Sequence, residues 1–221
     1  MTAAVVPSLA VAPAQADGFE SKAQRRLNQL GCDAGPADGR IGDWTRTAIV
    51  RFQAANRLHQ SGTLSQRTRT RMYADRQVRC DRRPVVRSGQ GRRVVVSQTQ
   101  NYVWLVQANG RVLAQGGLVD NPGELRPGSY RVGSLCGRQA KIRMNSDHGG
   151  QLWLPYFTRF ANCGVGFHRI PVDKSSGNQI HPDWLLGTNY RLSSGCIRLS
   201  QRVASRMWTF AGVGTRVVVV R

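Results

Sequence analysis

The sequence predicts an α+β, multidomain chain: a small three-helix module at the N-terminus, followed by a mostly-β domain with one helix near its end. Apolar residues recur at helical spacing between residues 21 and 75, and short Val-rich and aromatic runs bounded by turns dominate from Val94 onward. An arginine-rich, turn-rich stretch separates the two parts. The 221 residues suffice for a small and a medium domain. We therefore divide the chain into residues 1–16, 18–75, 76–93 and 94–221.

Residues 1–16 are small and apolar, and Ala14-Gln15-Ala16 has the form of a secretory cleavage site. The usual positively charged start is missing, so we interpret the segment as a signal peptide remnant. A disordered Ala/Pro-rich leader is the alternative. No other stretch reaches the roughly 18 apolar residues that a membrane-spanning helix needs. We expect a secreted, extracytoplasmic protein without an integral membrane segment.

The chain carries 32 basic and 12 acidic residues, a formal charge of +20, and all but three of the basic residues are arginines. The charge is spread over both predicted domains rather than collected in a tail. A field of this kind favours an anionic partner. In an exported chain, acidic wall polymers are better candidates than nucleic acid, and we find no base-reading helix or aromatic-rich sheet.

The five cysteines are Cys32, Cys80, Cys136, Cys163 and Cys196. An odd number in an oxidising compartment indicates disulfide pairs plus one free, reactive thiol. No C-x-x-C pair is present, so no structural zinc site is predicted. Our hypothesis pairs Cys32 with Cys80 and Cys136 with Cys163, leaving Cys196 free. Sequence alone does not determine connectivity, and the other pairings stay open.

Within residues 18–75, Ala23, Leu27 and Leu30 lie on one face of an expected first helix, and Gly31 follows as its stop. A second helix is expected to begin near Asp43 and a third to run from Leu64 to Met72. A disulfide from Cys32 would be a sensible staple for so small a core.

The same module carries a D-G-x-x-G-x-x-T motif at residues 38–45, preceded by Gln24 and followed by Phe52-Gln53. The physical alternative is a plain loop followed by a helix start. With the matching leucines and glycines, the pattern resembles the peptidoglycan-binding domain type 1, a three-helix family. This resemblance implies docking onto peptidoglycan, through its glycan or stem peptides, and no chemistry.

Residues 76–93 hold seven arginines together with Pro84, Gly89 and Gly91. We interpret them as a solvated basic linker, with attraction to wall phosphates or carboxylates as a reasonable addition. Strands are then expected from Val94 and over residues 102–106, with an Asn109-Gly110 turn leading into the next strand. One helix is expected over residues 201–210, before a closing strand at residues 216–221.

Two segments of the second domain carry candidate chemistry: residues 164–168, which end at His168, and residues 192–199 around Cys196. Acyl transfer by cysteine needs a thiolate, a histidine to handle its proton and donors for the oxyanion. Gly195 permits an unusual backbone conformation and close approach of a substrate. Arg198 can lower the pKa of the cysteine and hold a carboxylate. A buried structural Cys196 and a merely structural His168 are the alternatives.

The run S-x-G-C-I-R-L at residues 193–199, followed by a helix and a Val-rich strand, resembles the L,D-transpeptidase (YkuD-type) catalytic domain. The resemblance extends over about 125 residues and includes the Arg-Pro-Gly turn at residues 126–128. It implies that Cys196 is the nucleophile and His168 the base. It further implies that Gly195 lies at the oxyanion hole, that Arg198 faces the substrate, and that Ser193 opens the motif.

The family resemblance implies a reaction without metal or organic cofactor. Cys196 would attack the L,D-peptide bond of a tetrapeptide stem and release D-Ala, and a neighbouring stem amine would take the acyl group to give a 3→3 cross-link. Water as the acceptor would make the enzyme an L,D-carboxypeptidase. A protein-to-wall ligase, or a non-catalytic peptidoglycan-binding protein with a degenerate site, are further alternatives.

The sequence departs from the family pattern in three places. Ser194 stands where a second histidine is usual, and Arg169 follows His168 where a small residue is common, which leaves the group orienting the imidazole unidentified. The stretch between His168 and Cys196 is long, and we expect it to be a lid or substrate-selecting loop. Within polar loops, His148 and His181 are expected to be solvated surface residues.

Overall fold

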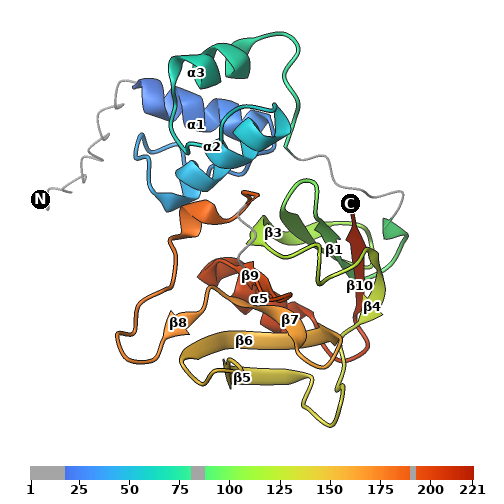
Figure 1. Ribbon diagram of the computed structural model, residues 1–221. Coiled ribbons are helices and arrows are strands. Elements are labelled where there is room, and N and C mark those ends of the chain that lie inside the picture. Colours follow the sequence, from blue (N-terminus) through green and yellow to red (C-terminus); the bar gives the residue numbers. More distant parts are fainter. Residues whose placement is uncertain (1–17, 81–87, 190–192) are drawn as a thin grey trace, which may run out of the picture.

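The computed structural model describes residues 18–80, 88–189 and 193–221, so the leader and residues 81–87 of the basic linker lie outside the described residues. Figure 1 shows a helical module packed against one side of a mostly-β domain. The module contains α1 (Phe19–Gln29), α2 (Asp43–Ala55) and α3 (Gln66–Tyr73). This confirms the predicted fold class. The third helix begins at Gln66 rather than at Leu64, because the Ser65 hydroxyl caps it by accepting from the Thr68 N–H at 3.3 Å.

Helix α1 ends as expected at Gly31, whose φ of 75° favours glycine. The Gly31 N–H donates to the Asn28 carbonyl at 2.9 Å and the Cys32 N–H donates to the Leu27 carbonyl at 2.9 Å. This pair of bonds is a Schellman motif, which satisfies carbonyls that the helix end leaves open. It also fixes Cys32 for its disulfide with Cys80, where the two Cα atoms are 4.8 Å apart.

The motif residues of the module are the centres of two buried hydrogen-bond networks. The amide nitrogen of Gln24 donates to Asp38 Oδ1, the Arg40 carbonyl and Thr45 Oγ1 at 3.0–3.1 Å, and its oxygen accepts from the Gly39 N–H at 2.8 Å. The D-G-x-x-G-x-x-T loop is therefore wrapped around one glutamine. Because buried polar atoms must be satisfied, the motif specifies loop shape.

Gln53 organises the loop between α2 and α3 through a similar set of hydrogen bonds. Its amide nitrogen donates to Ser61 Oγ, the Thr63 carbonyl and Thr68 Oγ1 at 3.0–3.1 Å, and its oxygen accepts from the Gly62 N–H at 3.1 Å. The two glutamines thus hold the two loops of the module in nearly identical ways. The small apolar core between the helices needs these networks, since it contains few large side chains.

The second domain is built on one ten-stranded sheet in the order β4-β10-β1-β2-β3-β9-β7-β6-β5, with β8 paired to β6. The strands are β1 (Arg93–Ser97), β2 (Tyr102–Val106), β3 (Val112–Val119), β4 (Gly128–Arg131), β5 (Lys141–Ser146), β6 (Leu152–Ala161), β7 (Val165–Arg169), β8 (Val172–Asp173), β9 (Ile197–Leu199) and β10 (Arg216–Val220). The expected Asn-Gly turn joins β2 to β3, with Gly110 at a φ of 82°. Helix α5 (Gln201–Phe210) has the predicted bounds.

Helix α5 covers the sheet with its apolar face. Val203, Ala204, Met207 and Phe210 are buried and join the main core with Phe167, Ile197 and Leu199 from the two central strands. The Ser200 hydroxyl caps the helix by accepting from the Val203 N–H at 3.3 Å. The core therefore packs against one face of β7 and β9, and the candidate site lies on the opposite face of these two strands.

The C-terminal end of the predicted linker is part of the folded domain. Arg92 donates to the Phe210 carbonyl at 2.6 Å and lies over the Phe210 ring, and Arg93 is a buried residue of β1 that donates to Ser88 Oγ. Both guanidinium groups bond to acceptors of the sheet domain, but only Arg93 is buried. The expectation of a solvated connector is therefore wrong for Arg93, which is the first residue of β1.

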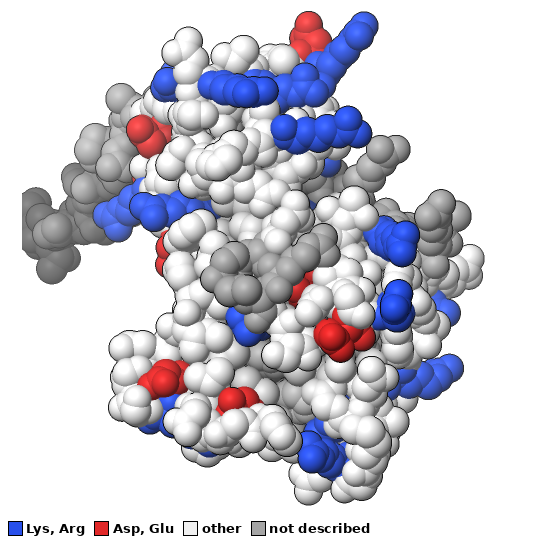
Figure 2. All heavy atoms as spheres, viewed as in Figure 1, with Lys and Arg blue, Asp and Glu red and all other residues white. Residues whose placement is uncertain are grey.

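The helical module and the sheet domain are in direct contact. Thr47 Oγ1 of α2 donates to the Asp183 carbonyl at 3.0 Å, and Arg202 of α5 forms a 3.2 Å ion pair with Asp33. The Gln60 side chain accepts from the Asn189 N–H at 3.1 Å. Figure 2 shows Lys and Arg side chains over both domains on the face in view, as the even charge distribution predicts. Within the described ranges, none of the helices has the length and apolarity needed to cross a membrane.

Candidate active site

Strands β7 and β9 bring the two predicted catalytic segments side by side. They pair in parallel, with His168 opposite Arg198 and Phe167 opposite Ile197. Side chains two residues apart on a strand share a face, so Cys196 lies on the same face as Arg198 and His168. Phe167 and Ile197 point the other way, into the core. The expectation that neighbouring strands join the two segments is confirmed.

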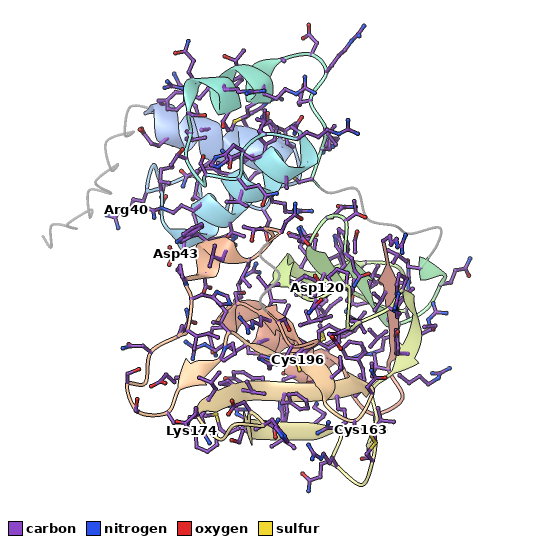
Figure 3. The ribbon with its side chains drawn as sticks, viewed as in Figure 1. Arg40, Asp43, Asp120, Cys163, Lys174 and Cys196 are labelled. Atoms are coloured by element: carbon purple, nitrogen blue, oxygen red, sulfur yellow. A yellow bond between two sulfur atoms is a disulfide. The ribbon has the colours of Figure 1, made fainter. Side chains whose placement is uncertain are left out.

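A cavity of about 700 Å³ opens over this face. His168, Ser194, Cys196 and Arg198 line it, together with Ser193. Figure 3 shows Cys196 within the sheet domain, set apart from the helical module at the top of the view. Cys196 is the one cysteine without a disulfide partner, and it is partly exposed. The other four form the two predicted pairs, Cys32–Cys80 and Cys136–Cys163.

His168 is buried, with 2% of its surface exposed, and its Nδ1 lies 2.5 Å from the Arg169 carbonyl oxygen. Because a carbonyl only accepts, Nδ1 carries the proton and Nε2 keeps its lone pair. This carbonyl is the orienting group that the sequence left unidentified. Burial lowers the pKa of His168 to about 4; the carbonyl works against this and the charges of Arg198 and His181 add to it. The imidazole is therefore neutral near pH 7.

The Cys196 thiol donates to the Gly164 carbonyl, with sulfur and oxygen 3.3 Å apart. Burial raises its pKa, and the Gly166 N–H, Arg159 and Arg198 lower it without cancelling that effect. Arg198 thus acts in the expected direction, but the net shift is upward. The free site rests as a neutral thiol beside a neutral imidazole, which is the starting point for general-base activation of a thiol.

The loop before Cys196 has a conformation that its residue types dictate. Gly195 has a φ of 109°, and a Cβ there would lie 3.2 Å from the Cβ of Glu124. The buried Ser193 hydroxyl donates to the Cys196 carbonyl, and the Asn121 side chain donates to the Ser193 carbonyl at 3.0 Å. Ser193 therefore closes the loop on itself, whereas Ser194 is exposed at the cavity.

The long stretch between His168 and Cys196 is anchored to the helical module over much of its length. The Arg169 guanidinium donates twice to Gln179 Oε1, at 2.9 and 3.2 Å, and Gln179 Nε2 donates to Asp183 Oδ1 at 3.1 Å. Asp183 begins the short helix η1 (Asp183–Leu185), which packs on α2. The lid interpretation is therefore wrong for residues 183–189, which contact the helical module, whereas a substrate-selecting role of the stretch stays a prediction. Residues 190–192 lie outside the described residues.

The two remaining candidate histidines differ in environment. His148 is exposed, as expected, although it lines the cavity rim. His181 is 7% exposed, and its Nδ1 lies 3.1 Å from the Pro182 carbonyl oxygen. Burial lowers its pKa, and the charge of Arg198 does so as well, which places it near the site. The prediction of a solvated His181 is wrong, because its ring is buried within electrostatic reach of Arg198 and His168.

Sequence reasoning missed Arg159, a buried residue of β6 that lines the cavity and acts on the pKa of Cys196. The signal was present: Arg159 is the single charged residue in the ten-residue strand LWLPYFTRFA. Charged side chains are rarely buried without a partner. An arginine inside an apolar strand run was therefore a candidate site residue.

Comparisons with known proteins agree with this geometry. Residues 21–72 match the model of the putative peptidoglycan binding domain family, and residues 91–219 match that of the L,D-transpeptidase catalytic domain family. No curated protein matches the chain significantly.

Two solved structures share the fold along nearly the whole chain. An L,D-transpeptidase from Xylanimonas cellulosilytica is 22% identical, with a TM-score of 0.62 over 97% of this chain and 100% of that one. An L,D-transpeptidase from Stackebrandtia nassauensis is 20% identical, with a TM-score of 0.54 over 98% of each chain. Identities this low establish the fold alone. The family model, however, matches more than half of the sequence. The chain therefore belongs to the L,D-transpeptidase family, with a peptidoglycan-binding domain ahead of its catalytic domain.

Proposed function

We propose that the protein is a cysteine-dependent peptidoglycan L,D-transpeptidase that forms 3→3 cross-links through a Cys196 acyl-enzyme on tetrapeptide stems. The observation that carries the proposal is the placement of His168, Cys196 and Arg198 on one face of β7 and β9, along one cavity. The helical module supplies the means of docking on the wall. The substrate and the disulfides together support an extracytoplasmic location.

In the proposed reaction, the Cys196 sulfur attacks the carbonyl carbon of the L,D-peptide bond while His168 Nε2 takes the thiol proton. The backbone N–H groups of Gly195 and Cys196 hold the oxyanion, and Arg198 holds a substrate carboxylate. As the C–N bond breaks, the imidazolium gives its proton to the leaving D-Ala amine and a thioester remains. An acceptor amine then attacks the thioester and loses a proton through His168, which restores the thiol.

The fixed tautomer of His168 suits this sequence of steps. Because Nδ1 donates to the Arg169 carbonyl, the proton can enter and leave only at Nε2. The low pKa keeps that nitrogen free to accept at neutral pH and makes the imidazolium a strong acid toward the leaving amine. Every step uses groups of the chain itself, and no cofactor enters the reaction as written.

The nucleophile is tested with Cys196→Ala and defined tetrapeptide stems, with products identified by mass spectrometry. The wild-type protein and the surface variant His59→Gln should form 3→3 dimers and release D-Ala, and Cys196→Ala should form none. A carbapenem should add its mass to the first two proteins only. If Cys196→Ala still forms dimers, the nucleophile is wrong. Absence of both acylation and turnover in the wild type would indicate a non-catalytic binding protein.

A further inference from the structure

One wall of the cavity holds a buried positive charge that has no acidic partner among the described residues. Arg159 is 2% exposed, and its guanidinium lies 4.9 Å from the centre of the Phe157 ring. Its Nε donates to the Gln139 carbonyl at 3.1 Å and its Nη1 donates to the Cys163 carbonyl. These bonds use two of the five N–H groups of the guanidinium. Donors and a full charge remain for the cavity that Arg159 lines.

A second arginine lies on the same wall. Arg138 is exposed and lines the cavity with Arg159. Burial lowers the pKa of Arg159, and the charge of Arg138 adds to that lowering, which places the two guanidinium groups near each other. Among the described residues that line the cavity, Asp147 is the one with an acidic side chain. Its Oδ1 accepts a hydrogen bond from the Leu152 N–H at 2.8 Å. Within the described part of the chain, Asp147 forms no ion pair with either arginine, and two neighbouring cations repel each other, so an anion between them relieves that repulsion.

The chain holds this wall rigidly. The Arg138 and Leu135 main chains form a two-bond bridge, at 3.0 and 3.2 Å, that closes a tight loop. The Cys136–Cys163 disulfide ties this loop to the residue whose carbonyl accepts from Arg159. Figure 3 shows Cys163 at the opposite end of the sheet domain from the helical module. The Arg159 guanidinium and the Arg138 main chain are thus held in place before any ligand arrives, which reduces the entropy lost on binding.

The wall lies next to the reacting sulfur. Arg159 pairs with Gly166 across β6 and β7, and Phe167 pairs with Ile197, so Gly166 separates Arg159 from Cys196 along one row of the sheet. A Cβ at Gly166 would lie 2.8 Å from the Phe157 ring, so the ring against which the Arg159 guanidinium packs covers this glycine. The charges of Arg159 and Cys196 influence each other in both directions. A group bound at Arg159 would therefore lie in the cavity that Cys196 also lines, two strands away along the same row of the sheet.

We propose that Arg138 and Arg159 form a carboxylate-binding subsite for the substrate peptide beside Cys196. The inference rests on the proposed function, since a tetrapeptide stem has carboxylates both on its terminal D-residue and on its diamino acid. A guanidinium pair recognises a planar carboxylate through charge-assisted, bidentate hydrogen bonds. Occupation by the terminal carboxylate would hold the leaving residue in register with the scissile bond.

Binding is measured separately from catalysis, by calorimetric titration of Cys196→Ala protein with tetrapeptides that are amidated at one carboxylate at a time. The unmodified peptide should bind about 10- to 100-fold more tightly than the peptide amidated at the carboxylate that the subsite holds. Amidation of the terminal D-residue and of the diamino acid distinguishes the two sources. Equal affinity for all peptides would overturn the subsite.

Arg138→Gln in the same background tests the assignment, because Arg138 is exposed and its loss leaves the fold intact. It should weaken the unmodified peptide about 10-fold or more and leave the amidated peptide unchanged, so that the difference between them vanishes. Arg138→Lys should restore part of the preference. Arg206→Gln on α5 removes one positive charge outside the cavity and should retain the full preference for the unmodified peptide. A full preference in Arg138→Gln would contradict the proposal.

Turnover by wild-type protein separates the two hypotheses. If the carboxylate preference is present in binding but the wild-type protein cross-links no stems, the subsite stands and the proposed reaction fails. If cross-linking proceeds with kcat/KM equal for acid and amide donors, the reaction stands and the subsite fails. Where both the subsite and the proposed reaction are correct, Arg138→Gln should raise KM for the donor stem with the free carboxylate and not for the amidated donor stem.

Discussion

Substituting His168 should remove a pH dependence of stability that its burial creates. The pKa of His168 is about 4 in the fold against an ordinary value of 6.5, so the unfolded chain binds the proton more tightly. Stability is therefore fully present above pH 6.5 and is lost progressively as the pH falls toward 4. The difference of about 2.5 units corresponds to about 3 kcal/mol between pH 7 and pH 4. His168→Asn keeps a side-chain N–H for the Arg169 carbonyl but does not titrate.

The assay is urea denaturation at several pH values between 7 and 4. The free energy of unfolding of the wild-type protein should fall about 3 kcal/mol further than that of His168→Asn over this range. His59→Gln, which removes an exposed histidine, should follow the wild type. His181, whose pKa burial also lowers, should leave a smaller slope of the same sign in His168→Asn. Parallel curves for wild type and His168→Asn would refute the buried, neutral imidazole.

Two further substitutions test the scaffold. Gly195→Ala places a Cβ at a φ of 109° and 3.2 Å from Glu124, which costs about 1–3 kcal/mol of strain. By displacing the Cys196 amide, this substitution should lower kcat at least 10-fold, whereas the control Gly212→Ala, with open space around it, should be near neutral. Equal kcat in the two variants would contradict this reasoning. The Cys32–Cys80 disulfide links residues 48 apart, and replacing both cysteines with alanine should destabilise the helical module by about 4 kcal/mol. The variant should therefore show a thermal transition at lower temperature. An unchanged transition would be incompatible with a stabilising role of this disulfide.

Local features such as helix ends, hairpin turns and buried helix faces were predictable, because each depends on a few residue types at fixed positions. Gly31 at a left-handed position ends α1, Asn109-Gly110 forms the hairpin, and the apolar face of residues 201–210 defines α5. The meeting of Cys196 and His168 was predictable as well, because His168 lies near the end of β7 and Cys196 directly precedes β9, each with glycine nearby. Their alignment on one face then follows from the two-residue period of a strand.

The rest of the site depends on contacts between residues distant in sequence. The Arg169 carbonyl orients His168 whatever its side chain, so residue identity at position 169 carried no signal for that role. His181 is buried near Arg198 and His168, and the η1 helix that follows it is held by Thr47 of α2, which lies 136 residues away from Asp183. A solvated loop and a docked loop have similar compositions, so the polar residues around His181 indicated exposure. Only the tertiary fold distinguishes the two.

The helical module is part of the scaffold that holds His168, the proposed base. From Thr47 on α2, hydrogen bonds run through the main chain and side chain of Asp183 to Gln179 and on to the Arg169 guanidinium. The carbonyl of that same Arg169 fixes the imidazole of His168. This segment is thereby restrained at both ends, by β7 and by α2. The helical module is therefore more than a separate binding domain, because its own helix completes the support of His168.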